Sequence, residues 1–179
     1  MHRLFVALRP PGPVRAKLTA IMGGVADARW QDDDQLHITL RFIGEVDGRQ
    51  ADDVAAALGT VSGPPLDLRI DGLGMFDKRG RVDALWAGVA PHDAIAALHR
   101  KVDRACVMAG LAPEGRAYLP HITLARFARS AMPDLSGFMA LHAGLSSASF
   151  TLDAFALFES HLGSDGARYD CVARYPLRG

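Results

Sequence analysis

The tetrapeptide His-Ile-Thr-Leu occurs twice in this chain of 179 residues, at His37–Leu40 and again at His121–Leu124. The two copies lie 84 residues apart, one in each half of the chain. A second pair of segments repeats at nearly the same offset, because "DGLGMF" from Asp71 resembles "DAFALF" from Asp153, 82 residues later. Matching offsets indicate an internal duplication. The chain is therefore expected to fold as two similar halves whose equivalent strands carry the same motif.

The predicted elements follow the same order in both halves. Runs of aliphatic and β-branched residues predict strands, and apolar residues at helical spacing predict helices. The expected strands cover residues 3–8, 36–46, 65–76, 83–90, 118–127, 149–158 and 167–177, and the expected helices cover 13–25, 48–58, 93–109 and 134–142. The "LFVAL" of the first strand resembles the "LWAGV" of the fourth, which adds a third repeated segment.

This order predicts an α+β protein with a duplicated bilobal fold. We expect two mainly antiparallel sheets with helices on their outer faces and a central cleft between the lobes. No linker rich in Pro, Gly or Ser separates the halves, so residues 1–179 are expected to form a single domain of two pseudo-symmetric lobes.

Charge and composition exclude several classes of protein. Twenty basic residues balance twenty acidic ones, which argues against a broad basic face that coats long nucleic acids. No apolar run approaches the roughly 20 residues of a membrane span, and the first residues contain no small-residue cleavage site. We therefore expect a cytoplasmic protein with no membrane association. Cys106 and Cys171 lie in separate apolar contexts without CxxC spacing, and are expected to be buried free thiols.

The repeated tetrapeptide places its polar side chains on one face of a strand. His37 and Thr39 point to one side and Ile38 and Leu40 to the other, and the second copy repeats the arrangement. If the halves pack about a pseudo-twofold axis, both polar faces line one groove. A single His in an apolar strand is more often structural. Two symmetric copies favour catalysis, since each polar side chain costs about 1–3 kcal/mol when it is buried unpaired.

Two imidazoles that face one substrate can divide acid and base work near neutral pH. This arrangement suits phosphodiester cleavage, in which the base deprotonates water and the acid protonates the departing oxygen. Thr39 and Thr123 are expected to donate hydrogen bonds to non-bridging phosphate oxygens. The five other histidines show no HxH or HExxH spacing, so we expect a site without metal or cofactor.

With these motifs in place, the chain resembles the 2H phosphoesterases, and more closely the bacterial RNA 2′,3′-cyclic phosphodiesterases, also called 2′-5′ RNA ligase-like proteins. The resemblance covers nearly the whole chain and is carried by "RLFVAL", "LHITLRFIGEV", "LWAGV", "PHITLAR" and "YDCVARYPL". It implies a bilobal fold and hydrolysis of 2′,3′-cyclic phosphate ends of RNA to 2′-phosphomonoesters. It also implies His37 as proton donor and His121 as proton acceptor, which the two identical motifs do not distinguish by themselves.

Two arginines are candidate phosphate ligands. Arg126 matches the "HITLAR" of the resembled family, yet strict alternation places it on the face opposite His121, so that it would need a β-bulge or the strand end to enter the cleft. Arg41 shares the face of His37 and Thr39 and is the second candidate, with a solvated arginine at the strand end as the alternative.

Several aromatic side chains are candidates for stacking on a nucleobase, although core positions are the commoner place for such residues. They are Tyr169, which we include among the substrate-binding residues, and Trp30, Phe42 and Phe127. The charged turn "DKRGR" is interpreted as a solvated hairpin in preference to a guide for RNA.

The expected partner is an RNA or oligonucleotide with a 2′,3′-cyclic phosphate end, bound by a monomer. The alternatives are reversible 2′-5′ RNA ligation, another small cyclic phosphodiester substrate and, least favoured, a non-catalytic RNA-binding module. ATP-driven ligation has no support because the chain has no P-loop, and the absence of GxSxG argues against a serine hydrolase.

Overall fold

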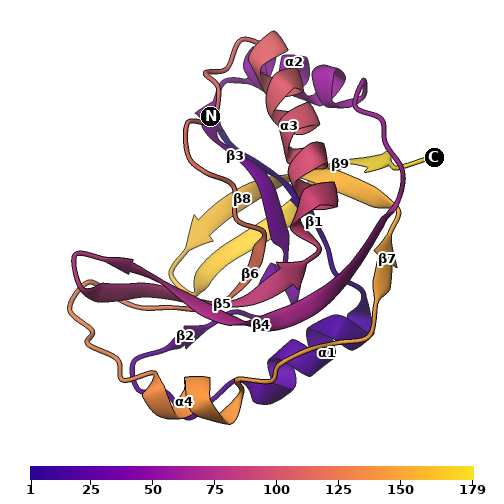
Figure 1. The fold of residues 1–179 in the computed structure, drawn as a ribbon. Coiled ribbons are helices and arrows are strands. Elements are labelled where there is room, and N and C mark those ends of the chain that lie inside the picture. The colour runs from indigo at the N-terminus through magenta and orange to yellow at the C-terminus, as the bar shows by residue number, and fades with distance from the viewer.

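The fold consists of nine strands and four α-helices in a computed structural model that describes residues 1–179 (Figure 1). The strands are β1 (His2–Leu8), β2 (Arg29–Trp30), β3 (Ile38–Val46), β4 (Leu66–Lys78), β5 (Arg81–Ala90), β6 (His121–Arg126), β7 (Phe150–Leu152), β8 (Ala154–Gly163) and β9 (Gly166–Pro176). The helices are α1 (Gly12–Ile21), α2 (Gly48–Leu58), α3 (His92–Met108) and α4 (Ser136–Leu141). The α+β class predicted from the sequence is confirmed.

All strand pairs are antiparallel, and the strands form one sheet in the order β7-β4-β5-β6-β3-β1-β8-β9, with β2 beside β6. The two sheets expected from the sequence are thus joined into one. A single residue pair, Ile38 with Ile122, joins β3 to β6 at the centre. Both residues belong to the repeated tetrapeptides, so the motifs lie where the two halves of the sheet meet.

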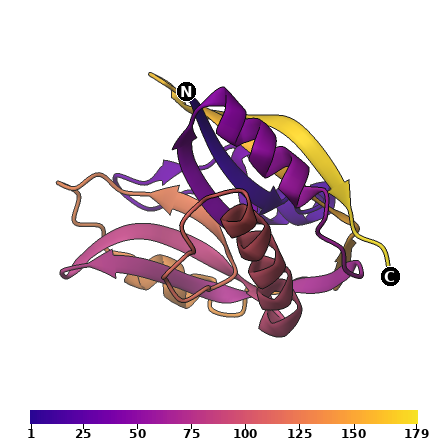
Figure 2. The ribbon, with the colours of Figure 1, turned by 90° about the horizontal axis from the view of Figure 1, so that it is seen from above.

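Apolar stripes hold the helices against the sheet. Helices α2 and α3 lie side by side at one end of the molecule, and α1 and α4 lie at the other (Figures 1 and 2). The buried residues of the first three helices join the main core, and they include Val14, Leu18, Val54, Leu58, Ile95 and Val102. Phe138 of α4 packs in a smaller core with Leu85, Ala125 and Phe127. Burial of these side chains supplies the main driving force for the fold.

The strand order has a symmetry that matches the repeated segments. By the sequence offsets, β5 corresponds to β1, β6 to β3 and β8 to β4. The sheet places β4-β5-β6 on one side of the centre and β8-β1-β3 on the other, in mirrored order. The third repeated strand of each half of the chain, β4 or β8, therefore lies beside strands that come from the other half. The duplication itself stays a prediction, which this order supports.

Local signals explain where several elements begin and end. Helix α2 covers the predicted residues 48–58, and the Asp47 side chain caps it by accepting a hydrogen bond from the backbone N–H of Gln50. Helix α1 ends at Ile21, four residues earlier than predicted, because Gly23 and Gly24 adopt positive φ angles of 129° and 73°. The short strand β2 and a 3₁₀ turn at Asp33–Gln35 were not predicted.

The predicted burial of the cysteines is correct for only one of them. Both thiols are free, and Cys106, on α3, is buried in the core. Cys171 is exposed, because it lies on β9 at the edge of the sheet. No helix in the structure is long and apolar enough to cross a membrane.

Candidate active site

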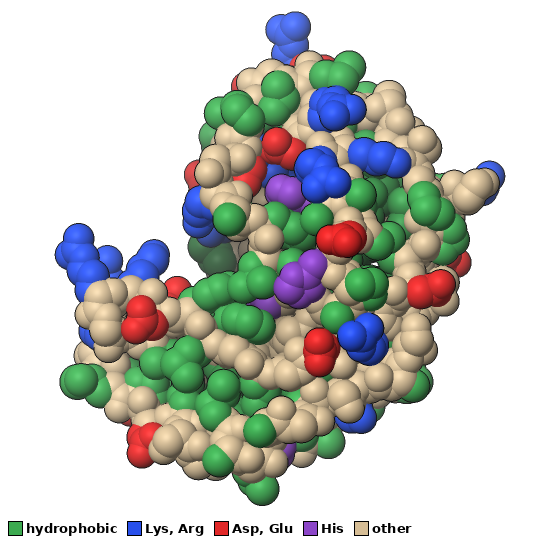
Figure 3. Space-filling model, viewed as in Figure 1, with side chains coloured by type: hydrophobic (Ala, Val, Ile, Leu, Met, Phe, Trp, Pro, Cys, Tyr) green, Lys and Arg blue, Asp and Glu red, His purple; other side chains and the backbone are tan.

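The two HxT motifs meet on one face of the sheet. Ile38 and Ile122 pair directly and are fully buried, so the residues on either side of them point to the opposite face. This register places His37 across from Thr123 and Thr39 across from His121. The two histidines are then diagonal neighbours, with about 7–8 Å between their Cα atoms. The molecule is hollowed between its two arms on this side (Figure 3).

A one-residue β-bulge follows the threonine of each motif. The strand pairing skips Leu40 on β3 and Leu124 on β6, and each is the fourth residue of its tetrapeptide. A bulge of one residue shifts the register and reverses the alternation of side chains beyond it. Residues after the motifs therefore point to the faces opposite those expected from strict alternation.

The bulge on β6 brings Arg126 to the cleft face. The side chain of Arg126 is exposed, and its positive charge contributes to lowering the pKa of both His37 and His121, after the larger effect of burial. An arginine on the opposite face would be shielded from the two imidazoles by the sheet and its core. The bulge required for Arg126 to enter the cleft is thus present in the structure.

The bulge on β3 turns Arg41 away from the cleft, so the face predicted for this residue is wrong. The side chain is only 7% exposed, and its guanidinium forms an ion pair of 2.9 Å with Asp103 of α3. It also donates a hydrogen bond of 2.5 Å to the carbonyl oxygen of Ala112. Arg41 therefore connects β3 to α3 and to the loop after it.

Hydrogen bonds fix the orientation of the His37 ring. Its Nδ1 lies 2.6 Å from the carbonyl oxygen of Gln35, which accepts the Nδ1–H, and its Nε2 lies 3.0 Å from the Thr39 hydroxyl. Burial is the main reason why the pKa of His37 is lowered from 6.5 to about 4; the Gln35 hydrogen bond opposes this shift, and Arg126 and His121 add to it. The ring is neutral at pH 7 in the free protein.

His121 is held in the same way. Its Nδ1–H donates to the carbonyl oxygen of Leu119 over 2.7 Å, which leaves Nε2 as the second functional nitrogen of the ring. Burial lowers the pKa of His121, the Leu119 hydrogen bond opposes the shift, and Arg126 lowers the pKa further. In each motif, the backbone carbonyl two residues before the histidine accepts the Nδ1–H and so fixes both rings in the same tautomer.

Aromatic rings enclose each histidine. The centroid of Phe5 lies 4.9 Å from that of His37, and Phe158 stacks on Phe5 at 5.3 Å. Around His121, Phe76 lies at 4.8 Å and Trp86 at 5.8 Å. None of these four rings was predicted from the sequence to line the site. They occupy equivalent places in the repeated segments, Phe5 with Trp86 and Phe158 with Phe76, and this correspondence was the signal that could have found them.

Among the predicted aromatic candidates, Tyr169 lies nearest the motifs. Its ring contacts His37 edge-on at 5.4 Å and also contacts Phe5. Trp30 packs against Phe138 and Phe127 is buried, so both belong to the core. Phe42 is 44% exposed and lies under the guanidinium of Arg3.

Gly74 permits the position of the Trp86 ring beside His121. A Cβ atom at Gly74 would lie 2.2 Å from two ring atoms of Trp86, which is far too close. Gly74→Ala is therefore expected to move the ring, disturb the packing of His121 and lower kcat by roughly 10- to 100-fold. Steady-state turnover measures this effect. Gly137→Ala is the control, because nothing lies within 4 Å of the added methyl group there, and equal activity of the two variants would contradict the assignment.

Half-buried His37 is expected to make the protein acid-sensitive. Its pKa of about 4 in the folded state is below the 6.5 of an unperturbed imidazole, so protonation favours the unfolded state. The stability contribution is complete above about pH 6.5 and is lost as the pH falls towards 4, by roughly 2–3 kcal/mol. Urea unfolding at pH 7 and pH 4.5 should show a smaller loss of stability for His37→Gln than for the wild type. Equal losses would show that His37 is not the responsible group.

The structure brings together no group of three or more His, Cys, Asp or Glu side chains that could hold a metal ion. The protein groups available at the site are thus the two imidazoles, the two hydroxyls, Arg126 and the aromatic rings. Such a set can transfer protons and bind an anion.

A family model described as the 2′-5′ RNA ligase superfamily matches residues 10–164. A Geobacillus stearothermophilus protein named RNA 2′,3′-cyclic phosphodiesterase is 29% identical over 153 residues, which cover 84% of this chain and 48% of that protein. An Archaeoglobus fulgidus protein of the same name is 26% identical over 170 residues, covering 93% and 96%. The chain spans about half the length of the Geobacillus relative, at 48%, and a match to an Aeropyrum pernix protein of the same name covers 53% of this chain and 54% of that protein.

Solved structures share the fold. Escherichia coli LigT in complex with 3′-AMP superposes with a TM-score of 0.77 at 25% identity, over 99% of each chain. A Thermus thermophilus protein gives a TM-score of 0.77 at 26% identity, over 99% of this chain and 98% of that one. The family match over most of the chain and the shared fold agree with the paired HxT motifs, and the chain belongs to the 2′-5′ RNA ligase superfamily.

Proposed function

We propose that this protein hydrolyses 2′,3′-cyclic phosphate ends of RNA to 2′-phosphomonoesters. The observation that carries the proposal is the direct pairing of two HxT motifs on one face of the sheet. In the proposed reaction, the two imidazoles, whose tautomers are fixed by backbone carbonyls, act on one phosphate from either side. Several relatives named RNA 2′,3′-cyclic phosphodiesterase support this choice of reaction.

The reaction divides its proton transfers between the histidines. One imidazole takes a proton from water as the water oxygen attacks phosphorus and the bond from phosphorus to O3′ breaks. The other imidazole gives its proton to O3′, so that the phosphate remains on O2′ and the two histidines exchange protonation states. Following the family resemblance, His37 is the donor and His121 the acceptor.

The donor role requires His37 to gain a proton when substrate binds. The lowered pKa keeps its ring neutral in the free protein at pH 7. A phosphate anion beside the ring favours the charged form and raises this pKa. If the donor assignment is reversed, His121 carries the proton, and the pH dependence of the two single variants distinguishes the cases.

Four further side chains support the phosphate and the nucleoside. Thr39 and Thr123 lie beside the histidines and donate hydrogen bonds to the non-bridging oxygens as negative charge grows. Arg126 binds the phosphate by charge-assisted hydrogen bonds. Tyr169 packs on the nucleoside attached to the reacting phosphate. A protein that acts on RNA ends in this way is expected in the cytoplasm, as a monomer with one complete cleft.

The proposal is tested by incubation with 2′,3′-cyclic AMP and with an oligonucleotide that ends in a cyclic phosphate, in the presence of EDTA. The expected product is the 2′-monophosphate, identified by chromatography against the 2′ and 3′ isomers. The 3′ isomer as product, or activity only after addition of a divalent metal, would contradict the proposed chemistry. Joining of a 5′-hydroxyl RNA in the same assay would reveal the reverse reaction, 2′-5′ ligation.

A further inference from the structure

Four basic side chains gather at the end of the β4–β5 hairpin. Lys78, Arg79 and Arg81 come from the hairpin and Arg129 from the segment after β6, and these four residues alone line one hollow. None of them takes part in an ion pair. The whole chain carries equal numbers of basic and acidic residues, so this group is a local excess of positive charge. We call it the cationic rim.

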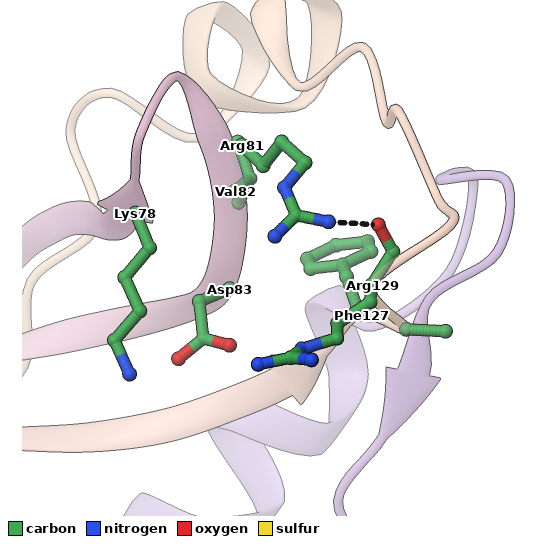
Figure 4. A pocket seen from close by; sticks show the side chains of 7 residues that line it. Lys78, Arg81, Val82, Asp83, Phe127 and Arg129 are labelled. Carbon is green, nitrogen blue, oxygen red and sulfur yellow. Dashed lines mark hydrogen bonds between the residues drawn. The ribbon is translucent and has the colours of Figure 1, made fainter.

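The backbone holds the cationic rim in a defined arrangement. The guanidinium of Arg81 donates a hydrogen bond of 2.5 Å to the carbonyl oxygen of Arg129, which ties the hairpin to the segment after β6 (Figure 4). A second hollow of about 90 Å³ adjoins the first, and Asp83 is the one carboxylate in its lining. The linings of the two hollows together contain four cations and one carboxylate, so this surface keeps a net positive charge.

The cationic rim lies on a path that leads to the paired motifs. Trp86 pairs with Thr123 and Ala84 with Arg126, and β5 then continues to Arg81 at the hairpin. The five residue-to-residue steps from Trp86 to Arg81 span about 17 Å, at about 3.3–3.4 Å per step. Arg126 lies between the motifs and the rim along this path. In the space-filling view, basic side chains gather at the tip of one arm, at the mouth of the hollow (Figure 3).

The other long hairpin, β8–β9, lies on the opposite side of the centre of the sheet and has no such surface. On β9, Arg168 pairs with Asp170 over 3.0 Å, and His161 of β8 contacts the same carboxylate at 3.1 Å. Hairpin formation therefore does not require a group of unpaired cations. The two long hairpins, on opposite sides of the centre of the sheet, therefore differ in charge.

We propose that the cationic rim binds backbone phosphates of the RNA strand that leads to the reacting end. This inference rests on the proposed function, and it adds that the protein prefers a polymer to a mononucleotide. Unpaired Arg and Lys side chains bind phosphates and release counterions, which gives affinity without base preference. Because Arg126 lies between the motifs and the cationic rim, an RNA strand that extends from the cleft could contact all of these cations. An acidic protein that docks on the hairpin tip alone would not use Arg126, so RNA is the favoured partner.

The test compares two substrates in one variant. Lys78→Gln, Arg81→Gln and Arg129→Gln are combined with Arg79→Asn, because Arg79 has a φ of 53° before Gly80 at 78°, and Asn-Gly suits such a turn. The matched control is Arg168→Gln on the opposite arm. The substrates are 2′,3′-cyclic AMP and an oligonucleotide of roughly 6 residues with a cyclic phosphate end.

The quadruple variant is expected to lower kcat/KM for the oligonucleotide by at least about tenfold at low salt, because several phosphate contacts are lost. Its kcat/KM for 2′,3′-cyclic AMP should stay within about twofold of the wild type, since this substrate has no upstream phosphate. The salt dependence of oligonucleotide binding should become shallower by about 0.7 per lost contact. The Arg168→Gln control should leave both substrates unchanged.

An equal loss for both substrates, or no loss for either, would overturn the proposal. Fluorescence anisotropy with a labelled single-stranded RNA measures binding separately from turnover. If the wild type hydrolyses neither substrate, the proposed function fails, and the anisotropy still decides whether the cationic rim binds RNA. Unchanged RNA affinity in the quadruple variant would rule out RNA as the partner and leave an acidic protein as the alternative.

Discussion

Replacement of His121 by Ala is expected to lower kcat by at least about 1,000-fold while the fold is retained. General acid or base catalysis typically contributes 10²–10⁴ in rate, and the same loss is expected for His37→Ala. The ring of His121 is held by a hydrogen bond to the carbonyl oxygen of Leu119 and by packing on Phe76, so its removal affects the site more than the core. Turnover of 2′,3′-cyclic AMP measures the effect, and circular dichroism checks the fold.

The double variant of both histidines gives a sharper result. The two imidazoles act in one concerted step, so the losses of the single variants should not multiply. His92→Ala is the control, because His92 is an exposed residue at the start of α3. Residual activity within about tenfold of the wild type in either single variant would mean that the paired motifs are not the catalytic groups.

Arg126 is expected to bind phosphate and Arg41 to stabilise the fold, although strict strand alternation places Arg41 on the face of the histidines and Arg126 on the opposite face. Arg126→Met should lower kcat/KM by about 100-fold or more, because it removes a cation that binds the phosphate, and it should leave the free energy of unfolding nearly unchanged. Arg41→Met should lower the free energy of unfolding by roughly 2–3 kcal/mol, because Asp103 loses its partner in a largely buried ion pair.

Parallel kinetics and urea unfolding of both variants test this contrast. The Arg41 variant is expected to retain nearly full turnover under conditions in which it is folded. A large loss of activity for Arg41→Met with normal stability, together with normal activity for Arg126→Met, would show that the bulges do not place these side chains as described.

Much of the architecture is predictable because the signals are local and strong. The cap at Asp47 and the helical spacing that follows define α2 to the residue. The repeated tetrapeptide identifies the two central strands and the face of each that carries polar groups. The predicted duplication would also account for the meeting of the two motifs, since a pseudo-twofold arrangement brings equivalent strands together.

The bulges at Leu40 and Leu124 are the feature that strand periodicity does not predict. Neither position carries a glycine, and the surrounding residues suit a regular strand. Comparison of the two copies could have indicated that Arg41 is buried. Arg41 and Ala125 occupy equivalent positions, and alanine is more typical of a buried site than of a phosphate ligand. Cross-strand packing with β1 and β5 decides the register, and this information is not local.

Local sequence patterns also did not predict that the strands of both lobes join in one sheet. The junction consists of one residue pair, and the crossing of β4 and β8 into opposite lobes depends on long-range pairing. Local patterns also do not predict the aromatic rings around the histidines, since Phe5 and Phe158 come from opposite ends of the chain.

A crystal structure with bound 2′-AMP would show whether both imidazoles reach one phosphate. We expect one phosphate group with the Nε2 atoms of His37 and His121 each within about 3.2 Å of one of its oxygens, and with Arg126 in contact. A phosphate that contacts only one of the two rings, or that binds outside the cleft, would contradict it.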